Sequence, residues 1–228
     1  MFALLATVIP LGLAAAVRPS LLALQLLIVG QPHWWPRARA LAIGAALPLV
    51  IFGVLVFLGL NQLPTPQPGE LDVLGVSIRT IIGFGFLVAA IWLIRSHPSL
   101  EERSAQFMQG KAQHASTRDF FFLGLALNGK SLTSYALLLP ALHDITTFEQ
   151  GVEWQILALV VLYALALSTL WVPVLLAIFM GKRGGTALVK LSDFVLRHNF
   201  TILGVMFLLV GIYLTGSAAV LVAIFERL

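Results

Sequence analysis

Six long apolar runs constrain the fold of this 228-residue chain more than any other feature of its sequence. A helix that crosses a bilayer needs about 20 apolar residues, because ~30 Å of hydrocarbon is covered at 1.5 Å per residue. Runs of this kind are Phe2–Gly30, Ala40–Leu60, Val73–Ile94, Phe120–Leu142, Trp154–Met180 and Phe200–Val222. They predict an all-α polytopic membrane protein with six transmembrane helices.

The composition agrees with a membrane protein and excludes several other classes. Hydrophobic residues make up 59% of the chain and charged residues 11%, whereas about 25% of a soluble domain is charged. Cysteine is absent, which excludes disulfides, thiolate zinc sites and iron–sulfur clusters. The net charge of +4 is not gathered into a basic patch with interleaved aromatic residues, so we expect no nucleic-acid partner.

The distribution of positive charge predicts the orientation. Loops 31–39, 95–119 and 181–199 carry ten Lys or Arg residues, whereas loops 61–72 and 143–153 carry none. The positive-inside rule places the basic loops in the cytoplasm. We therefore expect a multi-pass protein of the cell inner (plasma) membrane with both termini on the outer side.

Two of the runs resemble each other without gaps. Residues 80–94 and 201–215 share seven of fifteen positions, among them Gly83 and Gly204. The match predicts two inverted three-helix repeats, residues 1–94 and 119–228, joined by a cytoplasmic linker over 95–118. Pro48 and Pro173 fall in the second and fifth runs, which would be matching positions of the two repeats. Ordinary kinking of bundle helices explains these two prolines equally well. In the linker, Ser99 and Glu102 have the spacing of a capping box and predict the start of a short surface helix. A mobile polar linker is the alternative.

Three cations lie inside the runs, where no carboxylate accompanies them: Arg18, Arg79 and Lys130. A charge at the bilayer centre costs roughly 2.5–3.5 kcal/mol, so water, carbonyl groups or an anion must offset it. Lys130 lies ~15 Å from the cytoplasmic start of its run, and Arg18 is also deep. Arg79 is only ~9 Å from the outer end, so we expect it to reach the headgroups, with a role in the site as the alternative.

Both deep cations accompany helix-breaking residues. Pro19 cannot donate a backbone hydrogen bond and disfavours helical geometry at Arg18, which predicts an unwound segment at 17–20. Asn128 and Gly129 precede Lys130 and suit a break or turn. The first and fourth helices should therefore be broken. The predicted substrate-binding residues are Arg18, Pro19, Ser20, Asn128, Gly129, Lys130, Ser131 and Arg79.

The residues around these breaks resemble a known family. Asn128-Gly129-Lys130, with the apolar run to Pro140, is similar to the element that opens the second half of the lysine-exporter (LysE/RhtB) superfamily. Segment 14–20, with Pro32, Arg37 and Gly44, resembles its glycopeptidolipid-addressing (GAP, Sap-like) branch. The resemblance implies an exporter of two inverted halves that moves a cell-envelope lipid to the outer face.

Enzymatic and metal-dependent functions find no support in the sequence. The five histidines lie in loops or at run ends without helical ligand spacing, and no nucleophile motif or phosphate-binding loop is present. We expect no enzyme, no metal and no cofactor. The predicted function is export or flipping of an anionic envelope lipid or lipid-linked precursor by alternating access. The alternatives are an amino-acid or small-metabolite exporter and a non-transporting scaffold. Expected partners are membrane lipids and an anionic lipid or small anionic substrate, and a homodimer stays open.

Overall fold

The computed structural model describes residues 2–60, 62, 72–95, 115–148, 151–181 and 185–225, and within these ranges it holds no strand. Its helices are α1 (Phe2–Ala16), α2 (Pro19–Val29), α3 (Trp34–Leu60), α4 (Val73–Arg95), α6 (Thr117–Gly129), α7 (Leu132–Thr146), α8 (Val152–Ala166), α9 (Ser168–Met180), α10 (Gly185–Arg197) and α11 (Asn199–Phe225). Helices α3, α4 and α11 are long and apolar enough to cross a membrane, and so are the pairs α1–α2 and α8–α9 if each bent pair is one span. The predicted all-helical membrane class is confirmed, and the described helices give three candidate spans, or five if each bent pair is one span.

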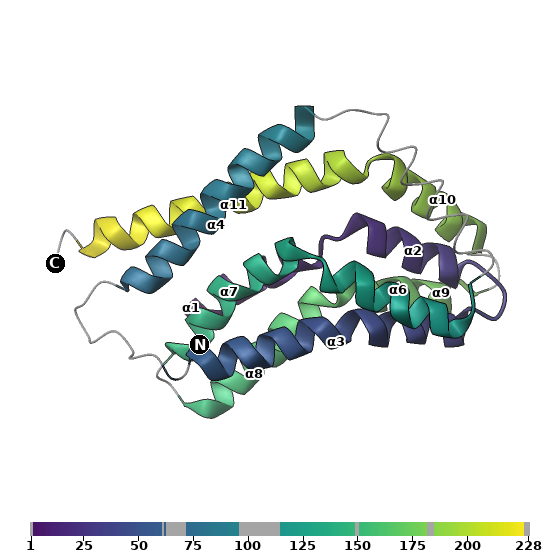
Figure 1. Cartoon of the computed structure of the whole chain (residues 1–228), viewed down its shortest axis with the longest axis horizontal. Helices are drawn as coiled ribbons and strands as arrows, with labels where there is room; N and C mark the ends of the chain where they lie inside the picture. The colour runs from purple at the N-terminus through teal and green to yellow at the C-terminus, as the bar shows by residue number, and fades with distance from the viewer. Residues whose placement is uncertain are drawn as a thin grey trace.

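The helices run between two ends of the molecule. Both chain termini lie at one end, together with the start of α4 and the end of α7 (Figure 1). We call this the terminal end. The turn between α2 and α3 lies at the opposite end, where α3 carries Arg37 and Arg39 and α6 starts with Thr117 and Arg118. We call this the basic end.

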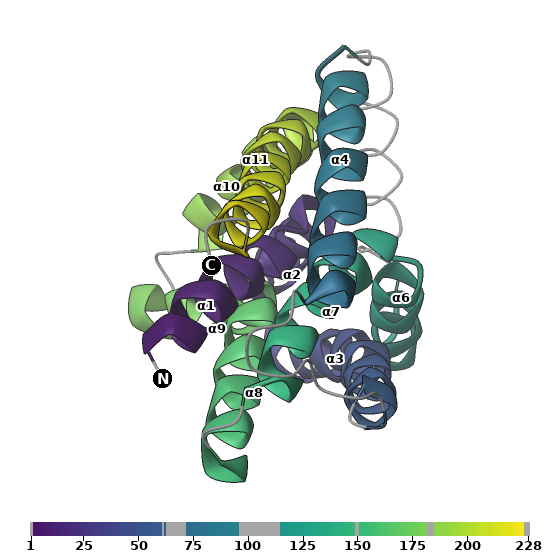
Figure 2. The ribbon, with the colours of Figure 1, turned by 90° about the vertical axis from the view of Figure 1, so that its left-hand side faces the viewer.

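Helices α4 and α11 pack side by side and lie on one side of the other helices (Figures 1 and 2). Glycines allow their close approach, because a Cβ on Gly83 would lie 3.0 Å from Cβ of Leu214 and one on Gly204 3.5 Å from Cβ of Leu93. Between these contacts the rings of Phe86 and Phe207 meet at 4.9 Å.

Helices α3 and α6 also pack through small residues. A Cβ on Gly44 would lie 2.0 Å from the carbonyl oxygen of Phe121, and one on Gly124 2.4 Å from that of Leu41. Such distances leave no room for a side chain, since a backbone carbonyl cannot swing aside. The two backbones therefore touch where the second half of the chain begins.

The fifth predicted run is broken, which the sequence analysis did not expect. Helix α8 ends at Ala166, and α9 begins at Ser168 after a bend of 64°. Pro173 is not the site of the bend, although it removes one backbone donor from the first turns of α9. The bend is centred on Leu167, whose carbonyl oxygen accepts a hydrogen bond from the N–H of Leu170, three residues later in the chain.

Two predicted loops are partly helical. Segment 181–199 contains α10, because Leu188, Ser192, Val195 and Leu196 recur at helical spacing and bury one face. The linker predicted over 95–118 is shorter, since Arg95 belongs to α4 and α6 starts at Thr117. The surface helix expected near Ser99 lies outside the described residues.

The start of α6 is fixed by a capping box. The side chain of Ser116 accepts a hydrogen bond from the Asp119 N–H, and the Asp119 carboxylate accepts one from the Ser116 N–H at 2.7 Å. The hydrogen bond from the Ser116 backbone, and to a smaller extent the one with the Ser116 side chain, hold the pKa of Asp119 below its ordinary value. This cap therefore favours the folded state above the ordinary aspartate pKa, and its contribution is lost as the pH falls through the lowered one.

Candidate functional site

Three helix breaks meet near the middle of the long axis of the molecule (Figure 1). The first separates α1 from α2 by a bend of 66°. It lies at the predicted place, because Pro19 opens α2 and Arg18 takes a non-helical conformation at the N-cap (φ −129°, ψ 81°). The predicted break of the first run is thus confirmed.

The second break separates α6 from α7 and confirms the predicted break of the fourth run. It lies later than expected: Gly129 is still helical, Lys130 caps the end of α6 and Ser131 precedes α7. Gly129 has no positive φ, and an added Cβ would meet nothing within 4 Å. Its glycine character is therefore not what ends the helix.

The Arg18 side chain joins all three breaks. Its Nη1 donates to Oδ1 of Asn128 at 2.5 Å, and its Nη2 donates to the carbonyl oxygen of Ala166. That carbonyl belongs to the last residue of α8, so the break deprives it of the usual hydrogen bond from the backbone N–H four residues later in the chain. Asn128 is fully buried and donates its own Nδ2 to the carbonyl of Ala45 on α3.

The first and third breaks brace each other in both directions. The hydroxyl of Thr169 in α9 donates to the carbonyl of Ala16, the last residue of α1. Arg18, just after α1, donates to Ala166, the last residue of α8. Each break thus supplies the donor that satisfies a carbonyl freed by the other. In addition, the Tyr135 hydroxyl donates to the Asn128 carbonyl at 3.0 Å.

The partners of Arg18 are neutral. Among the described residues its guanidinium touches amide and carbonyl oxygens and no carboxylate. Its Nε is buried and has no hydrogen-bond partner in that part of the chain. This partly buried cation therefore has no acidic partner among the described residues and has a donor to spare.

Two cavities border Arg18. The larger, of 470 Å³, lies between α1, α2, α9, α10 and α11. Its lining is apolar except for three residues: Arg18, Ser168 and Thr169. The smaller, of 200 Å³, is lined by predicted site residues Arg18, Pro19, Ser20 and Ser131, with apolar neighbours and Thr133. We call them the large and the small Arg18 cavity.

Lys130 does not occupy the buried position that the sequence predicts for it. The residue is exposed on the surface of the protein at the C-cap of α6, and it lines neither Arg18 cavity. The break turns the chain so that Asn128 points inward and the next two residues outward. The structure thus brings Arg18, Pro19, Ser20, Asn128 and Ser131 together and leaves Gly129 and Lys130 outside.

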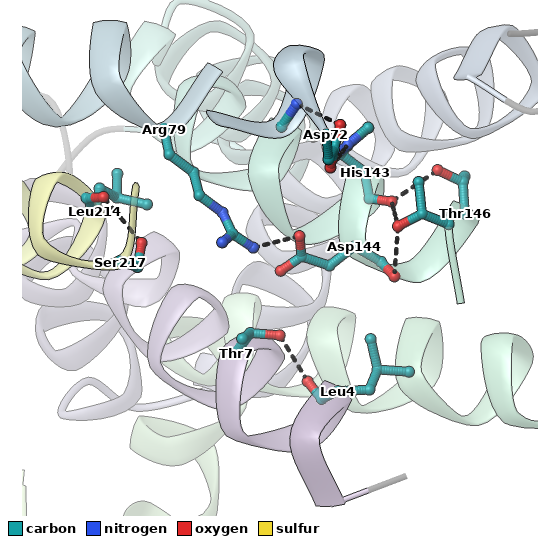
Figure 3. Close-up of polar contacts among 11 residues, drawn as sticks. Leu4, Thr7, Asp72, Arg79, His143, Asp144, Thr146, Leu214 and Ser217 are labelled. Atoms are coloured by element: carbon teal, nitrogen blue, oxygen red, sulfur yellow. Dashed lines mark hydrogen bonds and ion pairs between the residues drawn. The ribbon is translucent and has the colours of Figure 1, made fainter. Parts of the chain in front are cut away.

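Arg79 lies in an ion pair with Asp144, an acidic partner that the sequence analysis did not assign to it. Its Nη2 lies 2.5 Å from Oδ1 of Asp144, and both side chains are nearly buried (Figure 3). The sequence analysis placed Asp144 in a loop, whereas α7 continues to Thr146. Arg79 and Asp144 both lie near the same predicted membrane edge, which is the signal that could have paired them. Asp72 and His143 form a second pair at 2.7 Å that sequence reasoning missed.

Asn128 should be essential for holding Arg18. Asn128→Leu removes the acceptor of Nη1 and the donor to Ala45, and we expect it to destabilise the protein by about 1.5–3 kcal/mol. Thermal unfolding in detergent, followed by tryptophan fluorescence, measures this loss. Thr80→Val, which removes an exposed hydroxyl bonded to its own helix, is the control and should change stability by less than about 0.5 kcal/mol. Equal effects of the two variants would contradict the bridging role of Asn128.

The described residues hold no group of three His, Asp or Glu side chains that could bind a metal. The fold and site together define a helical membrane protein with broken helices around a partly buried arginine that has no carboxylate partner among the described residues. The chain belongs to the family described as Sap, sulfolipid-1-addressing protein (SfLAP), whose model matches residues 8–220. No curated protein and no solved structure matches it significantly.

Proposed function

We propose that this protein exports or flips an anionic cell-envelope lipid, or a lipid-linked precursor, by alternating access in the inner membrane. The family description names a sulfolipid, and a sulfolipid carries an anionic headgroup. Membership of a lipid-addressing family supports a role in lipid movement, and the site around Arg18 supports an anionic ligand. The protein acts in this proposal as a transporter and not as an enzyme.

The observation that carries the proposal is the guanidinium of Arg18, which is partly buried and contacts no carboxylate among the described residues. Arg has five N–H donors, and its bonds to Asn128 and Ala166 leave others for a ligand. Sulfate, phosphate and carboxylate groups match the planar fork of a guanidinium. A bound headgroup would offset the charge that neutral oxygens leave uncompensated.

The large Arg18 cavity favours a lipid over a free amino acid. Apart from Arg18 itself, only two hydroxyl residues interrupt its apolar lining. An acyl chain would fill such a space without loss of hydrogen bonds, whereas the ammonium group of an amino acid would find no carboxylate there. The small-metabolite alternative is therefore the weaker one.

The contacts between helices support six passes in two inverted halves. We treat α1–α2, α3 and α4 as one half and α6–α7, α8–α9 and α11 as the other. The pair α1–α2 packs on α8–α9 just as α6–α7 packs on α3. Such an exchange of partners is what a two-fold axis in the membrane plane requires.

The contact between α4 and α11 repeats the same symmetry at single residues. The aligned repeat equates Gly83 with Gly204 and residues 93–94 with 214–215. Gly83 lies against residues 214–215, and Gly204 lies against residues 93–94. Phe86 and Phe207 are equated with each other and stack on one another. These reciprocal contacts favour a true repeat over chance similarity of apolar helices.

The proposal is tested by native mass spectrometry of the protein purified gently from membranes. We expect the parent to retain an anionic lipid, and Arg18→Gln to lose it by about tenfold or more, since hydrogen bonds to a charged group contribute about 1.5–3 kcal/mol. Titration with phosphatidylglycerol and with zwitterionic phosphatidylethanolamine gives the same comparison with known lipids. Arg37→Gln, which removes an arginine at the basic end, is the matched control.

Each outcome separates the alternatives. Retention of a small anionic metabolite in place of lipid would favour the metabolite exporter. Equal lipid retention by the parent and Arg18→Gln would mean that Arg18 is structural and would favour a scaffold. Lys130→Gln should leave retention unchanged, because Lys130 borders neither Arg18 cavity.

A further inference from the structure

We propose that Arg79–Asp144 and Asp72–His143 form a latch that closes the terminal end of a seam between the α4–α11 pair and the other helices. Both pairs join the same two elements, because Arg79 and Asp72 belong to α4 or its start, whereas His143 and Asp144 belong to α7. The first pair is a salt bridge, and the second is a hydrogen bond between Nε2 of His143 and Oδ2 of Asp72. Figure 3 shows the four side chains gathered at this end, with Thr7 of α1 beside Asp144.

The seam, which is the interface between the α4–α11 pair and the helices it packs on, contains three cavities. The large Arg18 cavity is lined from α11 by Ile202 and Met206, and the small one by Leu203. A third cavity, of 280 Å³, lies between α4, α7 and α11 and includes Phe207. Successive residues of one helix thus line three cavities, and Thr133 borders both the small Arg18 cavity and the third one. Cavities occupy the interface along which the α4–α11 pair meets the other helices.

The Arg79–Asp144 and Asp72–His143 contacts lie on the terminal side of these cavities. On α4, Arg79 comes one turn before Ile82, the first residue that lines the third cavity. On α7, which runs in the opposite direction, Asp144 comes two turns after Ala136, the last residue that lines it. Neither Arg79 nor Asp144 lines the third cavity, and the pair bridges α4 and α7 beyond its terminal side.

Opening at the terminal end must separate polar groups that water reaches poorly. The guanidinium of Arg79 and the carboxylate of Asp144 lie 2.5 Å apart, with side chains only 11% and 13% exposed. Nε2 of His143 lies 2.7 Å from Oδ2 of Asp72, and the His143 side chain is 5% exposed. Both contacts link α4 and its start to α7, and they favour a resting state that is closed at this end.

This inference rests on the proposed function for its direction, since the terminal end is the outer side in that proposal. An exporter with such a latch would receive its lipid from the cytoplasmic side and would release it after the two latch contacts separate. The latch itself can be tested without any substrate. The absence of cysteine in the chain makes every introduced thiol a unique probe.

The test uses Ala136→Cys, which places a thiol in the cavity beneath the latch. Intact cells are treated with a membrane-impermeant maleimide, and the labelling rate is measured. Asp144→Arg sets two cations face to face, and we expect it to raise the rate by about fivefold or more. The exchanged pair Arg79→Asp/Asp144→Arg should return the rate to within about twofold of the parent.

Ala158→Cys controls for unfolding, because Ala158 is buried in α8 away from the seam. An unchanged rate at Ala136→Cys in Asp144→Arg would overturn the latch. A parallel rise at both cysteines in both charge variants would overturn it as well, since the pair would then hold the whole fold and not one end of it. Lipid retention by Arg18→Gln plays no part in these outcomes, so the latch and the proposed function fail separately.

Discussion

Replacing Asp144 with Asn should destabilise the folded protein by about 3–5 kcal/mol, because it leaves the nearly buried guanidinium of Arg79 without its counter-charge. The side chains of the pair are only 11% and 13% exposed, so water cannot take over the lost interaction. The large loss belongs to the single substitution. The double variant Arg79→Met/Asp144→Leu removes both charges and should lose much less, since apolar replacement of a buried pair is often neutral.

Denaturation in mixed micelles, with titration of a denaturing detergent and tryptophan fluorescence as the readout, measures both variants. Glu153→Gln, which alters an exposed carboxylate in the first turn of α8, is the control and should have an effect below about 0.5 kcal/mol. If the double variant lost as much stability as Asp144→Asn, the contribution of the pair would come from packing and not from charge.

Gly44→Val should be the most disruptive substitution in the α3–α6 contact. Its Cβ would lie 2.0 Å from the carbonyl oxygen of Phe121, which has no freedom to move within α6. The two helices would have to separate, and the buried bond from Asn128 to Ala45 lies one residue from that point. We expect a loss of about 3 kcal/mol or more, together with loss of lipid retention, because Asn128 holds Arg18.

Gly216→Ala in α11 is the matched control, since an added Cβ there meets nothing within 4 Å. It should be neutral or slightly stabilising, as expected when glycine is replaced in a helix. The two variants are compared by thermal unfolding and by the amount of monodisperse protein recovered. A Gly44→Val protein as stable as Gly216→Ala would show that α3 and α6 approach each other less closely than described.

The break of the first helix was predictable from local chemistry. Proline restricts its own backbone and that of the residue before it, so Arg18 and Pro19 mark the break wherever the segment lies. The break between α8 and α9 has no such signal. It falls at Leu167, six residues before Pro173. The freed carbonyl of Ala166 accepts from the distant Arg18, and that of Ala164 accepts from the indole of Trp171 in α9.

Arg18, Arg79 and Lys130 also differ in how much of their placement could be predicted from local sequence. Their depth in the apolar runs could be read from residue counts, and for Arg18 the structure agrees with it. Arg79 found a carboxylate two residues beyond a predicted run, and Lys130 turned away from the site at the cap of α6. Depth along a helix is a local quantity, whereas the direction of a side chain depends on how the helix ends and what packs on it.

The sequence by itself determined that this chain is a helical membrane protein, where two of its helices break and that a cation lies deep within it. Those features follow from hydrophobic length, from proline geometry and from the cost of charge in hydrocarbon, which act on each segment alone. Only the tertiary structure decided which oxygens hold Arg18, which carboxylate meets Arg79 and where the cavities lie. Such pairings join residues more than 60 positions apart, and they depend on helix packing that no local pattern encodes.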